Sequence, residues 1–209
     1  MFSEIVKLPA PRYDSPTSVE AALCARRSVR DYKDLPLTLA EVSQLLWAAQ
    51  GITSTRGFRT APSAGALYPL EVYLEVGKVK ELSSGIYKYE LFKHELIKYL
   101  AGDKRTALAN AALRQSCVKN GAVNIIFSAV YERITGKYGE RGIRYVYLEA
   151  GHAAPRSKGT FILLPWQDKL GYFFLMVFTF LSNFCRGVKF NAPTHLVSFS
   201  SASPTTIKS

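Results

Sequence analysis

The sequence predicts an α+β fold, with a mixed sheet flanked by helices. Segments with helical spacing of apolar residues alternate along the chain with short segments patterned like strands. The helical segments are residues 19–26, 39–50, 103–114 and 141–154, and the strand-like segments are residues 70–76, 85–89 and 123–130. At 209 residues the chain can build one substantial core, or one domain with an appendage.

Sequence signals for helix ends support the first two helices. Residues 1–16 are proline-containing and weakly periodic, so we expect an extended arm. Thr17 and Glu20 have the spacing of a capping box, which predicts the start of the helix over 19–26. A second such pair, Thr38 and Glu41, precedes a helix to Gln50, and the next residue is a glycine suited to end it.

The remaining elements follow from composition. Residues 59–69 (RTAPSAGALYP) form a loop of small residues, and LEVYLEV over 70–76 alternates like a strand with a hairpin partner over 85–89. The segment 103–114 is rich in Ala and Leu, and we expect Asp103 as its N-cap. The apolar run 123–130 suits a buried central strand, and the helix over 141–154 places Ile143, Val146, Tyr147 and Ala150 on one face.

Charge and cysteine usage limit the possible partners. The net charge of +11 suits anionic ligands, but the basic residues are scattered and no zinc-finger spacing exists, so we expect no nucleic-acid partner. The three cysteines are far apart and no His/Asp/Glu cluster has ligand spacing, which predicts buried free thiols and no metal site. The N-terminus has no apolar signal region, so we expect a cytoplasmic protein without a membrane segment.

A cluster of cationic side chains follows the first helix. Arg26, Arg27, Ser28 and Arg30 offer forked donors and a hydroxyl that match phosphate oxygens. The alternative is a solvated basic helix end that complements the helix dipole. The small-residue loop containing Ser63 favours the first interpretation, because a flat ring system can approach such a backbone closely.

Four colinear motifs between residues 19 and 154 together resemble one family. The runs ARRSVRDY, LTLAEVSQLLWAAQGIT, RTAPSAGALYPLEVYL and KYGERGIRYVYLEAGHAA resemble the nitroreductase-like flavoproteins, and more narrowly their SagB-type branch of thiazole- and oxazole-forming azoline dehydrogenases. The resemblance implies a nitroreductase-like fold that binds FMN at the interfaces of an intertwined homodimer. It also implies a small-molecule or peptide azoline substrate.

The resemblance assigns roles residue by residue. Arg26, Arg27, Ser28 and Arg30 match the segment that holds the FMN phosphate and ribityl chain, and Pro62, Ser63, Ala64 and Gly65 match the loop against the isoalloxazine ring. Lys137 and Tyr138 match the pair proposed to handle protons during azoline oxidation. Where broader nitroreductases carry a polar Asn-x-Gln pattern, this chain has Ala66, Leu67 and Tyr68, which favours the dehydrogenase branch.

The Lys-Tyr pair is also chemically suited to that reaction. Aromatising an azoline ring removes a hydride and a proton, and lysine can serve as the base only if burial or nearby cations lower its pKa. Arg133, Arg141 and Arg144 are the candidate cations. Alternatively, Lys137 is a solvated loop lysine and Tyr138 a packing residue. We expect His152 to be a structural residue of its helix.

The chain changes character after Ala154. Pro155 should end or kink the helix, and residues 155–209 hold one acidic residue, six Lys/Arg and eight of the twelve phenylalanines. The apolar run 170–184 is shorter than the ~20 residues of a membrane-spanning helix, which leaves a buried strand, a buried helix or an interfacial segment. We interpret the tail as a frameshifted or aberrantly joined segment, disordered at its end.

These observations divide the chain into an arm (1–16), a partial nitroreductase-like domain (17–154), which we expect to be incomplete at its C-terminal end, and an atypical tail (155–209). The leading functional hypothesis is an FMN-dependent oxidoreductase that dehydrogenates azoline rings or a related substrate. The alternatives are an NAD(P)H-dependent nitro- or quinone-reductase, and a truncated, catalytically silent flavoprotein fragment.

Overall fold

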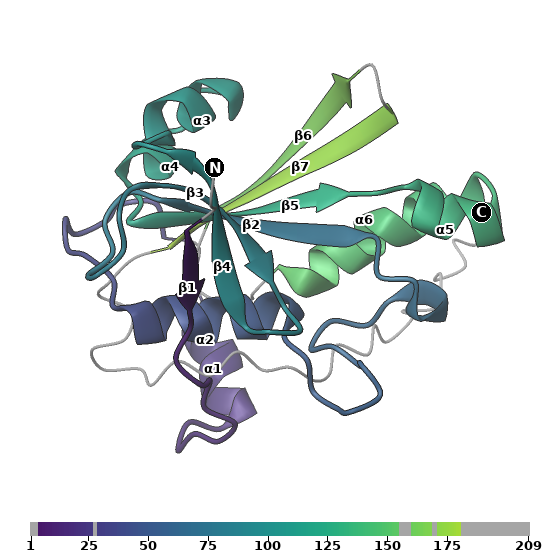
Figure 1. Ribbon diagram of the computed structural model, residues 1–209, viewed down its shortest axis with the longest axis horizontal. Coiled ribbons are helices and arrows are strands. Elements are labelled where there is room, and N and C mark those ends of the chain that lie inside the picture. The colour runs from purple at the N-terminus through teal and green to yellow at the C-terminus, as the bar shows by residue number, and fades with distance from the viewer. Residues whose placement is uncertain (1–3, 27–28, 155–159, 169–170, 181–209) are drawn as a thin grey trace, which may run out of the picture.

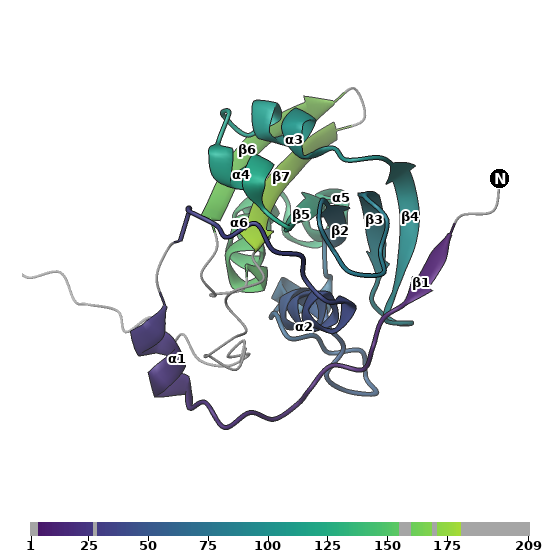
Figure 2. The ribbon, with the colours of Figure 1, turned by 90° about the vertical axis from the view of Figure 1, so that its left-hand side faces the viewer.

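A computed structural model describes residues 4–26 and 29–154, and the backbone of residues 160–168 and 171–180. Its centre is a seven-stranded sheet in the order β1-β4-β3-β2-β5-β7-β6. Helices cover this sheet on both faces, which confirms the α+β class (Figures 1 and 2). All neighbouring strands in the described sheet are antiparallel, so the expected mixed sheet is not seen. Three of the six pairings, β2-β3, β3-β4 and β6-β7, join strands that follow one another in the chain.

The strands are β1 (Ile5–Lys7), β2 (Leu70–Val76), β3 (Gly85–Glu90), β4 (Glu95–Ala101), β5 (Val123–Ala129), β6 (Thr160–Asp168) and β7 (Gly171–Phe180). The helices are α1 (Val19–Ala25), α2 (Leu39–Gln50), α3 (Arg105–Ala111), α4 (Ser116–Asn120), α5 (Glu132–Tyr138) and α6 (Arg141–Ala153), with a 3-10 turn, η1 (Ala64–Ala66). The extended arm contributes β1, which pairs with β4 at the sheet edge.

The two faces of the sheet are covered by different helices. Alternate residues of β2 and β5, such as Leu74 and Phe127, are fully buried in one cluster with the apolar faces of α2 and α6. Ile126 and Tyr73 point to the opposite face, where they meet the apolar residues of α3 and α4. The sheet therefore has helices on both sides, and β5 is a buried central strand as predicted.

Helix starts confirm one prediction and correct two. The capping box of Thr38 and Glu41 is present at α2. At α1 the N-cap is Ser18, whose hydroxyl accepts from the Ala21 amide, so the predicted Thr17 box is wrong. The helix α3 begins two residues later than expected, because the Asp103 carboxylate accepts from the Arg105 amide without being the N-cap.

Helix ends show how single residues stop a helix. Gly51 is the C-cap of α2 as predicted, and a side chain there would collide with the Trp47 ring and carbonyl. The helix α6 ends at Ala153, two residues before Pro155. Its Val146 and Ala150 are buried, but Tyr147 is exposed, so the predicted apolar face is shifted toward Glu149.

Several elements were not anticipated, among them β4 and α4, and one thiol prediction is wrong. The strand β4 and the short helix α4 lack strong sequence patterns; β4 is held by pairing on both sides, with β3 and β1. Cys117 is buried, whereas Cys24 is exposed on α1. Cys185 lies outside the described residues. Of the alternatives for the run 170–184, the described backbone of residues 171–180 is a strand, β7, that pairs with β5.

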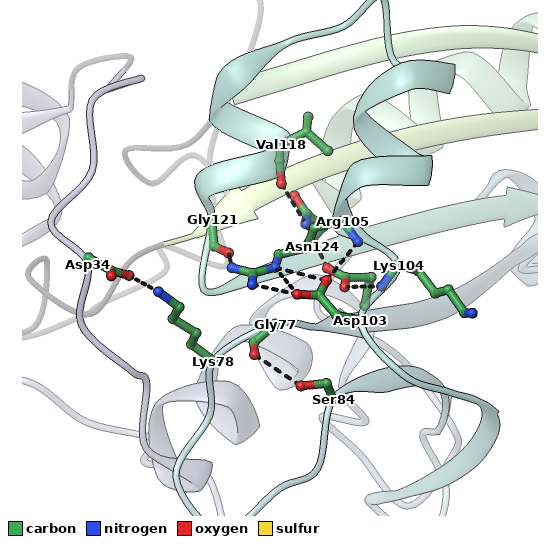
Figure 3. Close-up of polar contacts among 11 residues, drawn as sticks. Asp34, Gly77, Lys78, Ser84, Asp103, Lys104, Arg105, Val118, Gly121 and Asn124 are labelled. Carbon is green, nitrogen blue, oxygen red and sulfur yellow. Dashed lines mark hydrogen bonds and ion pairs between the residues drawn. The ribbon is translucent and has the colours of Figure 1, made fainter.

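A polar network ties the α3 side of the sheet together (Figure 3). Glu75 of β2 is fully buried, and its carboxylate accepts from the Asn124 side chain at 2.9 Å and the Lys104 amide at 3.3 Å. Burial raises the pKa of Glu75 to about 7, against the lowering effect of Asn124. Arg105 pairs with Asp103 at 2.6 Å and donates to the Gly121 carbonyl at 3.1 Å.

This network borders a cavity of about 400 Å³. It is lined by Tyr32, Asp34, Lys78, Asp103, Arg105, Thr106, Lys119 and Asn120. Two of its cations are already paired with its two carboxylates, Lys78 with Asp34 and Arg105 with Asp103. We therefore assign these two ion pairs a structural role, which is to join the segments around the sheet.

Candidate active site

The loop between α2 and β2 has a strained backbone around η1. Gly65 has a φ of 63°, and two non-glycine residues near it, Ala66 and Tyr68, have φ values of 55° and 45°. Such left-handed residues cost free energy and persist where surrounding contacts hold them, often at functional sites. Pro62 and Gly65 are exposed, and Ser63 and Ala64 are half-buried. The predicted ring-binding residues therefore form one surface loop.

Contacts made by the residues at both ends of this loop hold it in place. The Ser63 hydroxyl accepts from the Tyr68 amide at 2.9 Å and thereby closes the loop. The Arg59 guanidinium lies 4.1 Å from the centre of the Tyr68 ring and donates to the Gln50 side chain at 3.1 Å. Arg133 donates to the Tyr68 carbonyl at 3.1 Å. Arginine side chains therefore contact both the ring and the backbone of Tyr68.

The C-terminal end of α5 lies directly over this loop. A Cβ atom built on Gly65 would come within 2.8 Å of the Tyr138 hydroxyl and 3.1 Å of Lys137 Nζ. The predicted ring-binding loop and the predicted proton-handling pair are thus brought together across more than seventy residues of sequence. The pair is the last turn of a helix, not part of a loop, which corrects one sequence interpretation.

Aromatic and cationic neighbours orient Tyr138. Its half-buried ring packs edge-to-face on Tyr145 with centroids 5.1 Å apart. Lys137 Nζ and the Arg141 guanidinium lie 5.4 Å and 6.0 Å from the Tyr138 ring centre. Of the cations proposed to act on Lys137, Arg133 is engaged elsewhere, since it forms an ion pair with Glu71 at 2.6 Å.

A buried carboxyl group lies beneath the loop, and sequence reasoning did not single it out. Glu149 of α6 is 2% exposed, and neither carboxyl oxygen has a hydrogen-bond partner among the described residues. Burial raises the pKa of Glu149 to about 7, while the Ser63 hydroxyl and the Arg59 guanidinium oppose this rise. A glutamate on the apolar face of the helix over 141–154 was the signal that could have found it.

The predicted phosphate-binding residues lie elsewhere on the chain. Arg26 is the C-cap of α1, and Arg30 lies in the irregular segment that follows. Arg27 and Ser28 lie outside the described residues. The helix α1 stands apart from α5 in both views (Figures 1 and 2). Within one copy of the chain, the end of α1 with Arg26 and the end of α5 that contacts Gly65 therefore occupy separate places.

Other candidate residues have structural surroundings. The Trp47 ring packs edge-to-face with Tyr13, with ring centroids 5.4 Å apart. His152 is an exposed residue in the last turn of α6. Among the described residues, no group of three or more His, Cys, Asp or Glu side chains is arranged to hold a metal ion. Over the same residues, no helix combines the length and apolarity that crossing a membrane requires.

Comparison with known proteins identifies the family. The profile of the nitroreductase family matches residues 23–174, from within α1 to within β7. The chain has an α+β fold in which a strained loop faces a Lys-Tyr pair. It belongs to the nitroreductase family. The match extends beyond Ala154, where the motif resemblance ends.

Individual relatives support the assignment to this family. A protein of Methanocaldococcus jannaschii assigned to the nitroreductases is 47% identical over 136 residues, which is 65% of this chain and 69% of the relative. A crystal structure from Anabaena variabilis, with the same assignment, is 27% identical with a TM-score of 0.58; the match covers 68% of this chain but spans only 34% of that one.

Two further solved structures share the fold. A Ralstonia eutropha structure assigned to the nitroreductases has a TM-score of 0.65 and 21% identity, with 85% of this chain and 90% of that chain covered. The Escherichia coli microcin synthetase McbBCD complex with truncated pro-MccB17 bound contains a chain with a TM-score of 0.58 and 17% identity. That match covers 84% of this chain and 78% of the other.

Proposed function

We propose that this protein is an FMN-dependent oxidoreductase that dehydrogenates azoline rings or a closely related substrate. The observation that carries the proposal is the convergence of Lys137 Nζ and the Tyr138 hydroxyl on the surface of Gly65. Bound FMN would supply the two-electron acceptor, and the side chains supply position and proton handling.

The exposed surface of the loop fits a flat ring. Of its exposed residues, Gly65 has no side chain, Ala66 has only a methyl group, and Pro62 has a compact ring. On the side where a Cβ of Gly65 would lie, the Tyr138 hydroxyl and Lys137 Nζ already contact the backbone, and the residue is otherwise exposed. A planar aromatic system can therefore approach the backbone here with the lysine and tyrosine heads beside it.

The Lys-Tyr pair is suited to proton transfer. Lys137 is exposed, so its amine can exchange protons with solvent, whereas Tyr138 is half-buried and fixed by Tyr145. A positioned amine and phenol can take the proton that leaves an azoline ring as its hydride departs, provided that both reach the same side of the substrate. Their common contact with Gly65 supports such an arrangement.

We propose that Arg26, Arg27, Ser28 and Arg30 hold the FMN phosphate, and that each FMN lies between two copies of the chain. Two observations support an FMN site that is shared between two copies of the chain. The helix α1, whose C-cap is Arg26, stands apart from α5, whose end contacts Gly65 (Figure 2). The helix α1 has no buried residue and exposes Val19 and Leu23 by 45% and 46%, which suits a partner surface.

Purification of the protein tests FMN binding directly. We expect a yellow preparation with flavin absorbance and one FMN per chain. A colourless protein that stays free of FMN when the cofactor is added in excess would contradict the proposal and favour the silent-fragment alternative.

The second candidate is an NAD(P)H-dependent nitro- or quinone-reductase. It is favoured by the 47% identity to the M. jannaschii protein, which is assigned to the nitroreductases. Oxidation of NAD(P)H by the flavin-loaded protein with a quinone separates the two. We expect slow oxidation, because Ala66 and Leu67 replace polar residues in the loop. Rapid turnover would assign the reductase activity instead.

A further inference from the structure

One histidine joins the N-terminal arm to two other elements of the fold. His94 lies in the turn between β3 and β4, where its side chain is half-buried and its φ of 52° is left-handed. Such a backbone conformation is strained for a residue with a side chain, and it persists where contacts hold it. The contacts of the His94 ring are therefore of interest.

Both ring nitrogens of His94 have polar partners. Nε2 lies 2.7 Å from the Ser43 hydroxyl oxygen of α2 and 3.1 Å from the Pro9 carbonyl oxygen of the arm. Nδ1 lies 2.8 Å from the Tyr89 hydroxyl oxygen of β3. Ser43 and Tyr89 are buried, with exposed fractions of 1% and 2%. The ring thus connects the arm and α2 to the end of β3.

The positions of the protons in this cluster follow from its donors. The Ser43 hydroxyl donates to the Pro9 carbonyl, so its oxygen is left to accept the N–H of His94 Nε2. A neutral imidazole has one N–H, so Nδ1 is the acceptor for the Tyr89 hydroxyl. A neutral His94 ring therefore gives both of its nitrogens a matching partner.

A second proton on the ring does not fit this arrangement. It would sit on Nδ1 and face the hydrogen of the Tyr89 hydroxyl, which would have to turn toward another acceptor in a buried site. Burial raises the pKa of Tyr89, so the phenol keeps its own proton. Burial also lowers the pKa of His94, against the raising effect of the Pro9 carbonyl. Geometry and desolvation therefore both favour the neutral ring.

The other charged and titratable groups near the cluster belong to its own turn, to β3 and β4, to the arm and to the loop before β2. They are Lys93, Glu90, Glu95, Tyr13 and Arg59. Lys93 and Glu95 pair with each other at 3.8 Å. Tyr13, Arg59 and Glu90 act on the Tyr89 phenol. From α2, the ring faces the uncharged hydroxyl of Ser43.

These contacts fix the arm beside α2. The Leu8 amide donates to the His94 carbonyl at 3.1 Å, and the Leu8 side chain is part of the main core. Further along the arm, the Gln44 side chain binds the Arg12 amide at 2.8 Å and the Arg12 carbonyl at 3.2 Å. The arm then continues to α1 (Figure 2). Of these contacts, those of His94 are the ones that titrate near neutral pH.

We propose that His94 is a pH-sensitive clasp of the N-terminal arm: its neutral ring holds the arm at Pro9, and protonation of the ring releases this contact. Release would free the segment that leads to α1 and to Arg26. The clasp acts on the arm whether or not the chain binds FMN, so it goes beyond the proposed function and does not depend on it.

The direction of the pH effect follows from linkage. With the clasp closed, the pKa of His94 lies below its ordinary value of 6.5. An open clasp that exposes the ring to water would return this pKa toward 6.5. The closed clasp is therefore fully favoured above pH 6.5. This preference decreases as the pH falls from 6.5 to the lowered pKa, by up to about tenfold per pH unit.

Hydrogen exchange of the Leu8 amide measures closure of the clasp in the full chain. The protection factor of this amide corrects for the intrinsic exchange rate. We expect it to fall by about threefold or more from pH 7 to pH 5 in the natural protein. A Leu8 protection factor that stays constant over this range would overturn the proposal without any variant.

A variant that cannot be charged makes the assignment specific. In His94→Gln the side chain keeps an N–H donor for Pro9 and cannot gain a proton, so we expect equal Leu8 protection at pH 5 and pH 7. His152, an exposed residue of α6, changed to Gln is the matched control and should keep the natural pH profile. A His94→Gln profile that falls like the natural one would show that another group controls the arm.

Ser43→Ala tests the geometry of the clasp with His94 unchanged. It removes the hydroxyl that lies between His94 Nε2 and the Pro9 carbonyl, and alanine suits a helix position. We expect Leu8 protection at pH 7 to fall by about fivefold, the effect of one lost neutral hydrogen bond. Unchanged protection would show that this cluster does not hold the arm. The same measurement decides the question if His94→Gln disturbs the left-handed turn.

Discussion

Gly65 and Tyr138 are 73 positions apart in the sequence, yet a single added methyl group on Gly65 would reach within 2.8 Å of the tyrosine hydroxyl. This closeness places the loop before β2 directly under the end of α5. At the surface between them, Gly65 contributes no side chain and Tyr138 contributes a phenol that is held in a fixed position.

Replacing Gly65 by Ala should damage flavin binding more than stability. The left-handed φ of 63° costs an alanine about 1 kcal/mol, and the new methyl group would push against Tyr138. Gly102→Ala is the control, because Gly102 has a φ of 82° with open space around it. Urea unfolding should show similar losses for both variants, with FMN retention reduced in Gly65→Ala alone. Equal FMN retention would mean that the ring does not rest on Gly65.

Lys137→Ala and Tyr138→Phe should abolish or strongly reduce azoline dehydrogenation while FMN stays bound. Both changes remove a proton-handling group, and general acid–base groups contribute about 10²–10⁴-fold to rates. Single-turnover reduction of the bound flavin by an azoline substrate is the measurement. The exposed Lys93, changed to Ala, serves as the control. Persistent turnover in Lys137→Ala would show that the proton assignment is wrong.

Arg26→Ala and Arg30→Ala should each weaken FMN retention if this segment binds the phosphate. A lost charge-assisted hydrogen bond is worth about 1.5–3 kcal/mol, so we expect the dissociation constant to rise roughly 10- to 100-fold. Titration at two salt concentrations checks the electrostatic origin. Arg56→Ala removes an exposed arginine from another loop and should leave FMN affinity unchanged. Unaltered affinity in both variants would exclude the phosphate role.

Buried Glu75 should make the protein less stable as the pH rises. Its pKa is raised to about 7 in the folded state, so its stabilising effect is complete below pH 4.5 and is lost as the pH rises through 7. The full loss is about 3 kcal/mol at most. In Glu75→Gln, the difference in unfolding free energy between pH 5 and 8 should shrink by up to this amount. An unchanged difference would show that Glu75 keeps an ordinary pKa.

Much of the fold followed from local patterns. Periodic apolar residues in 39–50 and 70–76 fixed α2 and β2, because those patterns match a surface helix and a half-buried strand. The capping box formed by Thr38 was also predictable from the sequence. The strand β4 was not, because its residues after Ile97 are half-buried or exposed, and pairing with β1 and β3 decides its conformation.

The candidate site was predictable only in its parts. Motifs pointed to the loop around Gly65 and to Lys137, but their contact depends on long-range packing that no local pattern contains. Glu149 was missed because its burial results from how α6 packs on the sheet. The interpretation of residues 155–209 as an aberrantly joined segment stays a prediction, and sequencing of the coding region in independent isolates tests it.

The seven-residue helix α1 buries no side chain within its own copy of the chain. A helix this short is marginal in water without tertiary contacts, because nucleation costs more than so few hydrogen bonds return. Its helicity should therefore increase with protein concentration, as copies meet. The NMR amide resonances of Ala21 and Ala22 would then report self-association, and they would do so before a change in molecular mass is measured.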